Sequence, residues 1–166
     1  MIKKFVDAWY ANKDKLEEYI RTTDQSEYDT YEKLLKKLFE IVINPYLEKL
    51  GDHDWSTRPY DLDEITMLDH GDYQGTFIFI LHRKCYQPSV DDYVYTNTYY
   101  GSCSGCDTLQ GIHNYSDGLP SDGQVKDYME LLLHLLQRCN KMADTSNLNG
   151  RIIDCEEADG LFALLA

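Results

Sequence analysis

No stretch of this 166-residue sequence approaches the roughly 18 uninterrupted apolar residues that a membrane-spanning helix needs. Residues 1–7 include lysines, but no apolar segment follows them, so the sequence predicts no signal peptide. Internal repeats, long linkers and low-complexity tracts are also lacking. We therefore expect one domain over residues 1–166, located in the cytoplasm.

Basic residues are scarce, because 16 lysines and arginines stand against 29 aspartates and glutamates, and the net charge is −13. Such a chain repels nucleic acid and anionic membranes, so neither is expected as a partner, whereas a basic protein surface or a metal ion is attracted. The excess is uneven, since residues 1–50 hold nine basic and ten acidic side chains. Between positions 52 and 72 one base, Arg58, faces seven acids: Asp52, Asp54, Asp61, Asp63, Glu64, Asp69 and Asp72.

The five cysteines are an odd number, which favours reduced thiols over a disulfide framework. Hydrophobic residues make up 43% of the chain, so a packed core is expected without metal or disulfide staples. Tyrosine is abundant, with 14 copies, and its apolar ring and polar tip suit both half-buried positions and binding surfaces.

Apolar residues recur at three- and four-residue steps in the first fifty positions, which predicts two amphipathic helices. The first covers residues 2–20. The second begins after Ser26, its expected cap, and reaches Asn44, where Pro45 should end or kink it. A short loop between the two helices predicts that they pack as an antiparallel pair.

Strand patterns follow at residues 64–67, 76–81 and 93–99. The continuous apolar run of the second predicts a central strand covered on both faces. Near the C-terminus, residues 151–153 have the pattern of a short strand and residues 161–165 that of a short helix.

A long C-terminal helix is expected from Ser121, which forms a capping box with Gln124, to Met142, and a short helical segment at residues 107–112. The expected fold is therefore α+β: an antiparallel sheet of three to four strands packed against an N-terminal helix pair and a long C-terminal helix.

A glycine- and serine-rich turn, residues 101–106, follows the third strand. Cys103 and Cys106 have the C-x-x-C spacing with which two thiolates chelate one zinc ion. A structural zinc needs two more ligands, and the candidates are scattered: His82, Cys85, His113, Cys139 and Cys155. The same spacing at the start of a helix is also typical of a redox-active dithiol.

Two further interpretations of the turn remain open. Residues 101–105 have the G-x-nucleophile-x-G outline of a catalytic elbow, with Cys103 as nucleophile and His113 or His134 as base, although the sheet behind such elbows is larger than this chain can supply. A structural interpretation uses the glycines for a tight bend and Asp107 to cap the next helix. We expect no resident cofactor, with zinc at Cys103 and Cys106 as the alternative.

The acids of positions 52–72 could bind a divalent ion, but the alternating oxygen ligands and glycine of a calcium loop are missing. We expect them instead to form a contact surface for a basic protein. Tyr60 and Tyr73 are the expected exposed anchors within that surface.

Segments Asp69–Thr76 and Tyr100–Gln110 resemble parts of small, acidic, uncharacterised proteins of bacteriophages and mobile elements. The resemblance covers only these two segments and brings no activity with it. It implies an accessory viral protein in the cytoplasm of a bacterial host. Such proteins often occupy a host protein, including the nucleic-acid channel of a defence enzyme, so the expected function is non-enzymatic, anti-CRISPR-like inhibition of a host protein.

Overall fold

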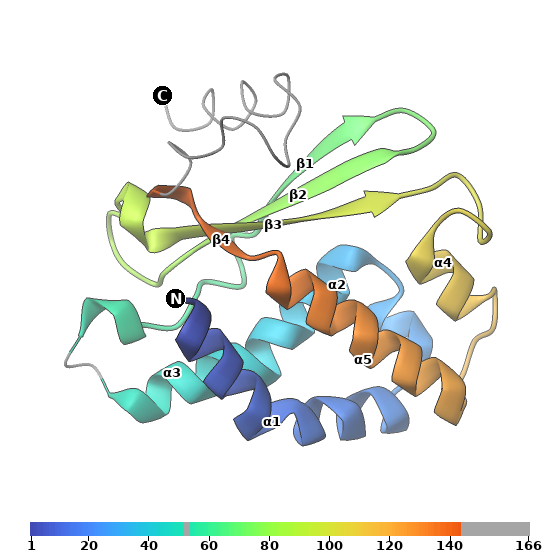
Figure 1. Cartoon of the computed structure of the whole chain (residues 1–166), viewed down its shortest axis with the longest axis horizontal. Coiled ribbons are helices and arrows are strands. Elements are labelled where there is room, and N and C mark those ends of the chain that lie inside the picture. The colour runs from blue at the N-terminus through green and yellow to red at the C-terminus, as the bar shows by residue number, and fades with distance from the viewer. Residues whose placement is uncertain (52–53, 144–166) are drawn as a thin grey trace.

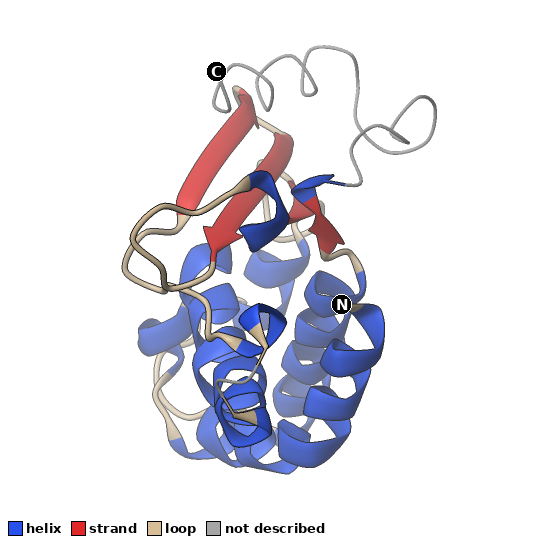
Figure 2. Cartoon of the chain, turned by 90° about the vertical axis from the view of Figure 1, so that its left-hand side faces the viewer, coloured by secondary structure: helices blue, strands red, loops and turns tan. Residues whose placement is uncertain are grey.

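The computed structural model of the chain describes residues 1–51 and 54–143. They form an α+β fold in which one antiparallel sheet lies against a layer of helices (Figures 1 and 2). The strand expected at 151–153 and the helix expected at 161–165 lie outside the described residues, as does Asp52. No helix among the described residues combines the length and the apolar character needed to cross a bilayer.

The sheet is an antiparallel meander with strand order β1-β2-β3-β4, which confirms the predicted topology. Strands β2 and β3 coincide closely with the predicted strands at 76–81 and 93–99, and they pair over the whole length of β2. The predicted strand at 64–67 is displaced, because β1 begins two residues later and ends four residues later. The fourth strand was not predicted, because the long helix expected to continue to Met142 ends at Gln137. The strands are β1 (Thr66–Gly71), β2 (Gly75–His82), β3 (Tyr93–Tyr100) and β4 (Asn140–Lys141).

Strand β2 is buried on both faces, as its apolar run predicts. Phe79 and Leu81 belong to the main core, which the helices share. Ile78 and Ile80 point the other way and pack with Tyr95 in a smaller cluster. Alternation along the strand thus sends neighbouring side chains into two different apolar layers.

Helix α1 (Ile2–Thr22) runs antiparallel to the chain that follows it, as predicted. Lys37 lies over the ring of Tyr19, near one end of α1. Farther back along α1, the buried amide of Asn12 donates to the carbonyl of Val42 at 3.0 Å. The earlier residue of α1, Asn12, thus contacts the later residue of the second segment, Val42, while Tyr19 contacts Lys37. The two segments therefore run in opposite directions.

The second predicted helix is a composite of α2 (Tyr31–Leu38), a π-helical turn (Phe39–Ile43) and α3 (Asn44–Leu50). Thr30 caps α2, so the expected cap at Ser26 is wrong. The expected end at Pro45 is also wrong. The amide of Asn44 donates to Phe39, five residues back, and this wider turn accommodates the proline at the start of α3.

Two further helices lie under the sheet, α4 (Thr108–His113) and α5 (Asp122–Gln137). The predicted capping box is confirmed: Ser121 Oγ accepts the amide of Gln124, and Gln124 Oε1 accepts that of Ser121. Short 3-10 turns connect the larger elements at Gln25–Tyr28, Trp55–Thr57 and Val90–Asp92.

The main core is unusually rich in tyrosine. Tyr28, Tyr31, Tyr60 and Tyr128 are buried, and Tyr28 meets Tyr128 edge to face at 5.1 Å. The hydroxyl of Tyr128 donates to Gln25 at 2.9 Å, so this buried polar tip is satisfied. This core draws residues from Phe5 through Cys139, while the single domain over residues 1–166 stays a prediction.

Replacing Asn44 by alanine should destabilise the fold by about 2–4 kcal/mol, because two buried backbone groups lose their side-chain partner. Asn44 Nδ2 donates to the Tyr60 carbonyl at 2.9 Å, and its Oδ1 accepts the Tyr60 amide at 2.8 Å. Urea unfolding followed by circular dichroism measures the change. Lys49→Ala, at the exposed end of α3, is the control and should shift stability by less than about 0.5 kcal/mol. Equal midpoints for the two variants would contradict this role of Asn44.

Stability should fall as pH rises above 10. Burial raises the pKa of Tyr31, Tyr60 and Tyr128 to about 12, and raises that of Tyr28 as well. The unfolded chain therefore ionises first, and each buried tyrosine removes at most about 1.4 kcal/mol per pH unit between pH 10 and its folded pKa. Urea titrations at pH 9, 10 and 11 check the slope, and a free energy of unfolding that is constant over this range contradicts it.

Candidate functional site

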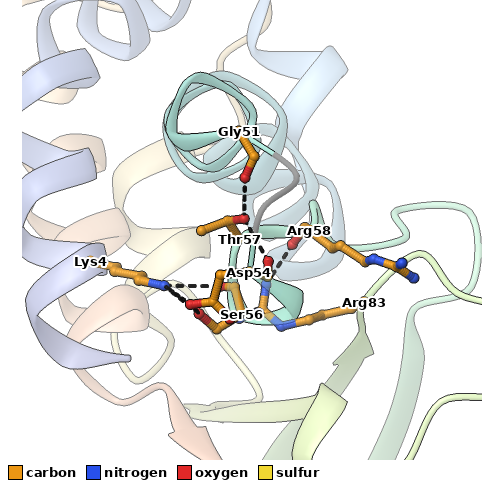
Figure 3. Close-up of polar contacts among 7 residues, drawn as sticks. All are labelled: Lys4, Gly51, Asp54, Ser56, Thr57, Arg58 and Arg83. Carbon is orange, nitrogen blue, oxygen red and sulfur yellow. Dashed lines mark hydrogen bonds and ion pairs between the residues drawn. The ribbon is translucent and has the colours of Figure 1, made fainter.

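The described acids of positions 54–72 do not form one surface. Asp54 is engaged within its own segment, as Figure 3 shows: its carboxylate caps the 3-10 turn through the amide of Ser56 at 3.0 Å. Lys4 reaches from α1 to the hydroxyl of Ser56 at 2.5 Å and lies 3.7 Å from Asp54. The turn is further tied down by Thr57, whose hydroxyl donates to the carbonyl of Gly51 at 2.5 Å. Asp54 is thus largely a structural residue.

The middle acids each have a polar partner close by. Asp63 lies 3.5 Å from Lys36, and Glu64 lies 3.0 Å from Nε2 of His82. Asp61 accepts the amide of Asp63 in a local turn. These residues lie where the chain enters β1, far along the strand from the hairpin tip that carries the last two acids.

Of the two expected tyrosine anchors, one is wrong. Tyr60 is fully buried, and the guanidinium of Arg83 covers its ring at 4.7 Å. Its aromatic ring belongs to the core, where it meets Phe39 edge to face. Tyr73 is 85% exposed at the tip of the β1–β2 hairpin, as an anchor would have to be.

The structure joins the two segments that are most distinctive in the sequence. The β1–β2 hairpin ends with Gly71 paired to Gly75, and Gly75 in turn pairs with Tyr100 at the end of β3. A Cβ on Gly71 would lie 2.7 Å from the Cα of Gly75, so the tip closes this tightly only with glycine. Asp69 accepts a 2.6 Å hydrogen bond from the Tyr100 hydroxyl. The hairpin tip and the cysteine turn therefore share one end of the sheet.

A pocket of about 320 Å³ lies beside this end, between the sheet, the start of α2 and the start of α4. We call it the aromatic–acidic pocket. Its lining residues are Asp29, Thr30, Tyr31, Glu32, Met67, Phe77, Phe79, Tyr100, Asp107, Leu109 and Gln110. Among these described lining residues there are three carboxylates and no lysine or arginine.

Aromatic rings form one wall of the pocket. Phe77 and Tyr100 are stacked, with centroids 4.1 Å apart and planes inclined by 18°, and Tyr31 lies 6.1 Å from Phe77. The hydrogen bond to Asp69, together with burial and the charges of Asp69 and Asp72, raises the pKa of Tyr100 to about 12. Tyr100 therefore keeps its proton, and its hydrogen bond to Asp69, to a higher pH than an ordinary tyrosine would.

Acidic side chains form the rim. Glu32 and Asp29 are exposed on and just before the first turn of α2, although Asp29 also accepts from Lys33 at 2.8 Å. Asp69 is paired with Phe77 across β1 and β2 and so lies on the pocket side of the sheet, while Asp72 is exposed at the hairpin tip. The sequence marked Asp69 and Asp72 as contacts but missed Asp29 and Glu32, because positions 1–50 are nearly neutral in total and nothing in the sequence brings α2 beside β1.

Asp107 is a buried lining residue of the pocket and connects three elements. Its carboxylate accepts the amides of Gly101 at 3.0 Å and Gln110 at 2.9 Å, and the hydroxyl of Tyr31 at 3.2 Å. The cap on α4 confirms the structural prediction for Asp107, with Gln110 as the bonded amide. The bond from Tyr31 adds α2 to the same carboxylate.

The two cysteines of the turn are exposed and lie side by side, with their Sγ atoms 2.9 Å apart. The amide of Cys103 donates to Cys106 Sγ at 3.0 Å, and the Ser102 hydroxyl lies 3.7 Å from it. The hydrogen-bond partners of the two sulfur atoms thus belong to the turn itself. They include neither His113 nor His134. The described residues contain no group of three or more His, Cys, Asp or Glu side chains that could hold a metal ion.

The remaining zinc candidates are spread out. Cys139 is buried in the main core, where its thiol donates to the carbonyl of Leu135. His82 is engaged with Glu64. Cys155 lies outside the described residues. Comparison of the chain with protein-family models, curated proteins and solved structures found no match.

Gly101→Ala should lower the free energy of unfolding by about 1–3 kcal/mol, because the added methyl group forces the turn apart. It would lie 2.7 Å from Cys106 Sγ and closer still to the Cys106 carbonyl. Gly105→Ala is the matched control in the same turn, since its methyl group meets nothing nearer than Cys103 Sγ at 3.9 Å. Thermal and urea unfolding of both variants test this, and a Gly105→Ala variant as unstable as Gly101→Ala would count against it.

Proposed function

We propose that this chain is a non-enzymatic binding protein that holds a basic surface of another protein, with one lysine or arginine side chain inserted into the aromatic–acidic pocket. The composition of the pocket is the main support. A stacked aromatic pair lies beneath a rim of carboxylates, and the described lining residues include no cation of their own.

Lysine and arginine match such a pocket because their stems are apolar and their ends are charged. The stem would pack on Met67 and Phe77, while the charged end would meet Glu32 or Asp69 at the rim. A cation over an aromatic ring contributes about 0.5–2 kcal/mol. The chain uses this interaction internally, since the guanidinium of Arg58 lies 3.6 Å from the centre of the Trp55 ring.

The other acids act at longer range. They are dispersed and several are paired, so they do not form the contact surface that the sequence predicts. Their sum still leaves the chain with a net charge of −13, and such a field attracts and orients a basic partner before contact. Tyr73 at the hairpin tip would add an exposed aromatic contact beside the pocket.

The resemblance of Asp69–Thr76 and Tyr100–Gln110 to segments of bacteriophage proteins directs the proposal toward a host protein. The two segments meet at the end of the sheet beside the pocket, through the pairing of Gly75 with Tyr100 and the hydrogen bond from Tyr100 to Asp69. A nucleic-acid-binding enzyme of host defence offers the large basic groove that such an acidic protein would occupy, and occupation would exclude the nucleic acid. Inhibition of such an enzyme is therefore the proposed biological consequence.

Titration with short peptides tests the pocket. A lysine- or arginine-containing peptide should bind, whereas the same peptide with acetylated lysines should bind at least about fivefold more weakly, because the charge is removed while the stem remains. Affinity for the basic peptide should fall as salt rises from about 0.05 to 0.5 M. Calorimetry or fluorescence of the tyrosines at the site gives the dissociation constants. Equal affinity for charged and acetylated peptides contradicts the proposal.

Isosteric variants separate the pocket from the general field. Glu32→Gln and Asp69→Asn each remove one charge, and the side-chain amide oxygen introduced by Asp69→Asn can still accept from the Tyr100 hydroxyl. The double variant should bind the basic peptide roughly tenfold more weakly. Glu48→Gln removes the same charge from the exposed end of α3 and should change affinity by less than about twofold. If the single variants Glu32→Gln, Asp69→Asn and Glu48→Gln weaken binding equally, the net charge and not the pocket is responsible.

A further inference from the structure

We propose that Cys103 and Cys106 are a redox-active dithiol that closes to an intramolecular disulfide by exchange with an external disulfide. This inference is independent of the proposed function. It rests on the geometry of the turn, in which two exposed sulfur atoms are already adjacent.

The sulfur atoms need little movement to bond. They lie 2.9 Å apart, and a disulfide requires about 2.05 Å. The backbone already returns on itself, since the amides of Cys106 and Asp107 both donate to the carbonyl of Cys103, at 2.9 and 2.8 Å. The buried carboxylate of Asp107 holds the amide of Gly101 at the other end of the turn. The turn is therefore pre-shaped for the closed form.

The other described cysteines do not combine an exposed thiol with a second thiol close by. Cys139 is buried, and burial raises its pKa to about 12, which suppresses the thiolate. Cys85 is half-buried, and burial raises its pKa too. Exchange chemistry needs an accessible thiolate with a second thiol within reach, and among the described residues only the turn offers both.

Cys106 is the attacking thiol. Its Sγ accepts the amide of Cys103 at 3.0 Å, and the thiol of Cys103 lies within hydrogen-bond distance on the same side. The hydrogen bond from Cys103 is the largest effect that lowers the pKa of Cys106, with smaller contributions from Ser102 and the backbone. Cys103 has no corresponding set of donors among the described residues and is suited to the second step.

The reaction balances without a further reagent. The Cys106 thiolate attacks one sulfur of an external disulfide, forms a mixed disulfide and releases the first thiolate. Cys103 then loses its proton to solvent and attacks Cys106 Sγ, which expels the second thiolate. The external disulfide is reduced to two thiols, and the two cysteines are oxidised to one disulfide.

Equilibration of the full chain in glutathione buffers tests the pair. Trypsin cleaves after Lys84 and Lys126 and nowhere between them, so Cys85, Cys103 and Cys106 share one peptide. The experiment therefore uses a Cys85→Ser background. After alkylation of free thiols, mass spectrometry should show this peptide changing in a single transition, as oxidised glutathione increases, from a doubly alkylated form to an unalkylated form two hydrogen masses lighter than the dithiol. Reduced thiols at both positions in oxidised glutathione alone would overturn the proposal.

Single variants test the assignment of roles. In Cys103→Ser the mixed disulfide at Cys106 cannot be resolved, so glutathione should accumulate on it. In Cys106→Ser the adduct on Cys103 should form about tenfold more slowly, because the stabilised thiolate is gone. Circular dichroism confirms that both variants are folded. Equal rates, or a faster adduct on Cys103, would overturn Cys106 as the attacking thiol.

Discussion

The buried carboxylate of Asp107 is the constraint on which the candidate site depends. A carboxylate removed from water must have its oxygen atoms satisfied, and Asp107 achieves this with two backbone amides and the hydroxyl of Tyr31. Those donors come from the end of β3, from α4 and from α2. One side chain therefore sets the distance between the cysteine turn and the helix that carries Glu32, and with it the width of the aromatic–acidic pocket. The same bond to Gly101 shapes the turn that brings Cys103 and Cys106 together.

The acidity of the chain has two separable roles. Summed over the molecule it produces a negative field, which depends on composition and hardly on arrangement. Contact requires specific groups at one place, and in the proposed binding mode these are Glu32 and Asp69 and not the whole run from 52 to 72. Asp54 and Glu64 serve the fold itself, as a cap and as the partner of His82. A count of charges along the sequence does not distinguish these uses, because it contains no information on which acids have a cation or an amide within reach.

Elements with a strong local signal were predictable. The apolar run of β2, the alternation in β3 and the capping box at Ser121 all appear where the pattern places them. Errors arose where tertiary contacts override the local rule. Pro45 does not end its helix, because a π-helical turn ahead of it relieves the backbone and the side chain of Asn44 binds Tyr60. Tyr60 stands among acids in the sequence and was expected at the surface, yet its ring is buried in the core against Phe5 of α1 and Phe39 of the π-helical turn.

By itself the sequence determined the class of fold, the order of the first three strands, the net charge and the proximity of Cys103 to Cys106. Each of these depends on local periodicity, composition or short spacing. Only the tertiary structure decided that the hairpin tip, the cysteine turn and the start of α2 meet at one end of the sheet. That meeting depends on contacts such as Tyr31 to Asp107, 76 residues apart, and on Asp69 to Tyr100, 31 apart. Such pairs form only when the whole core packs, so no local pattern in the sequence predicts them.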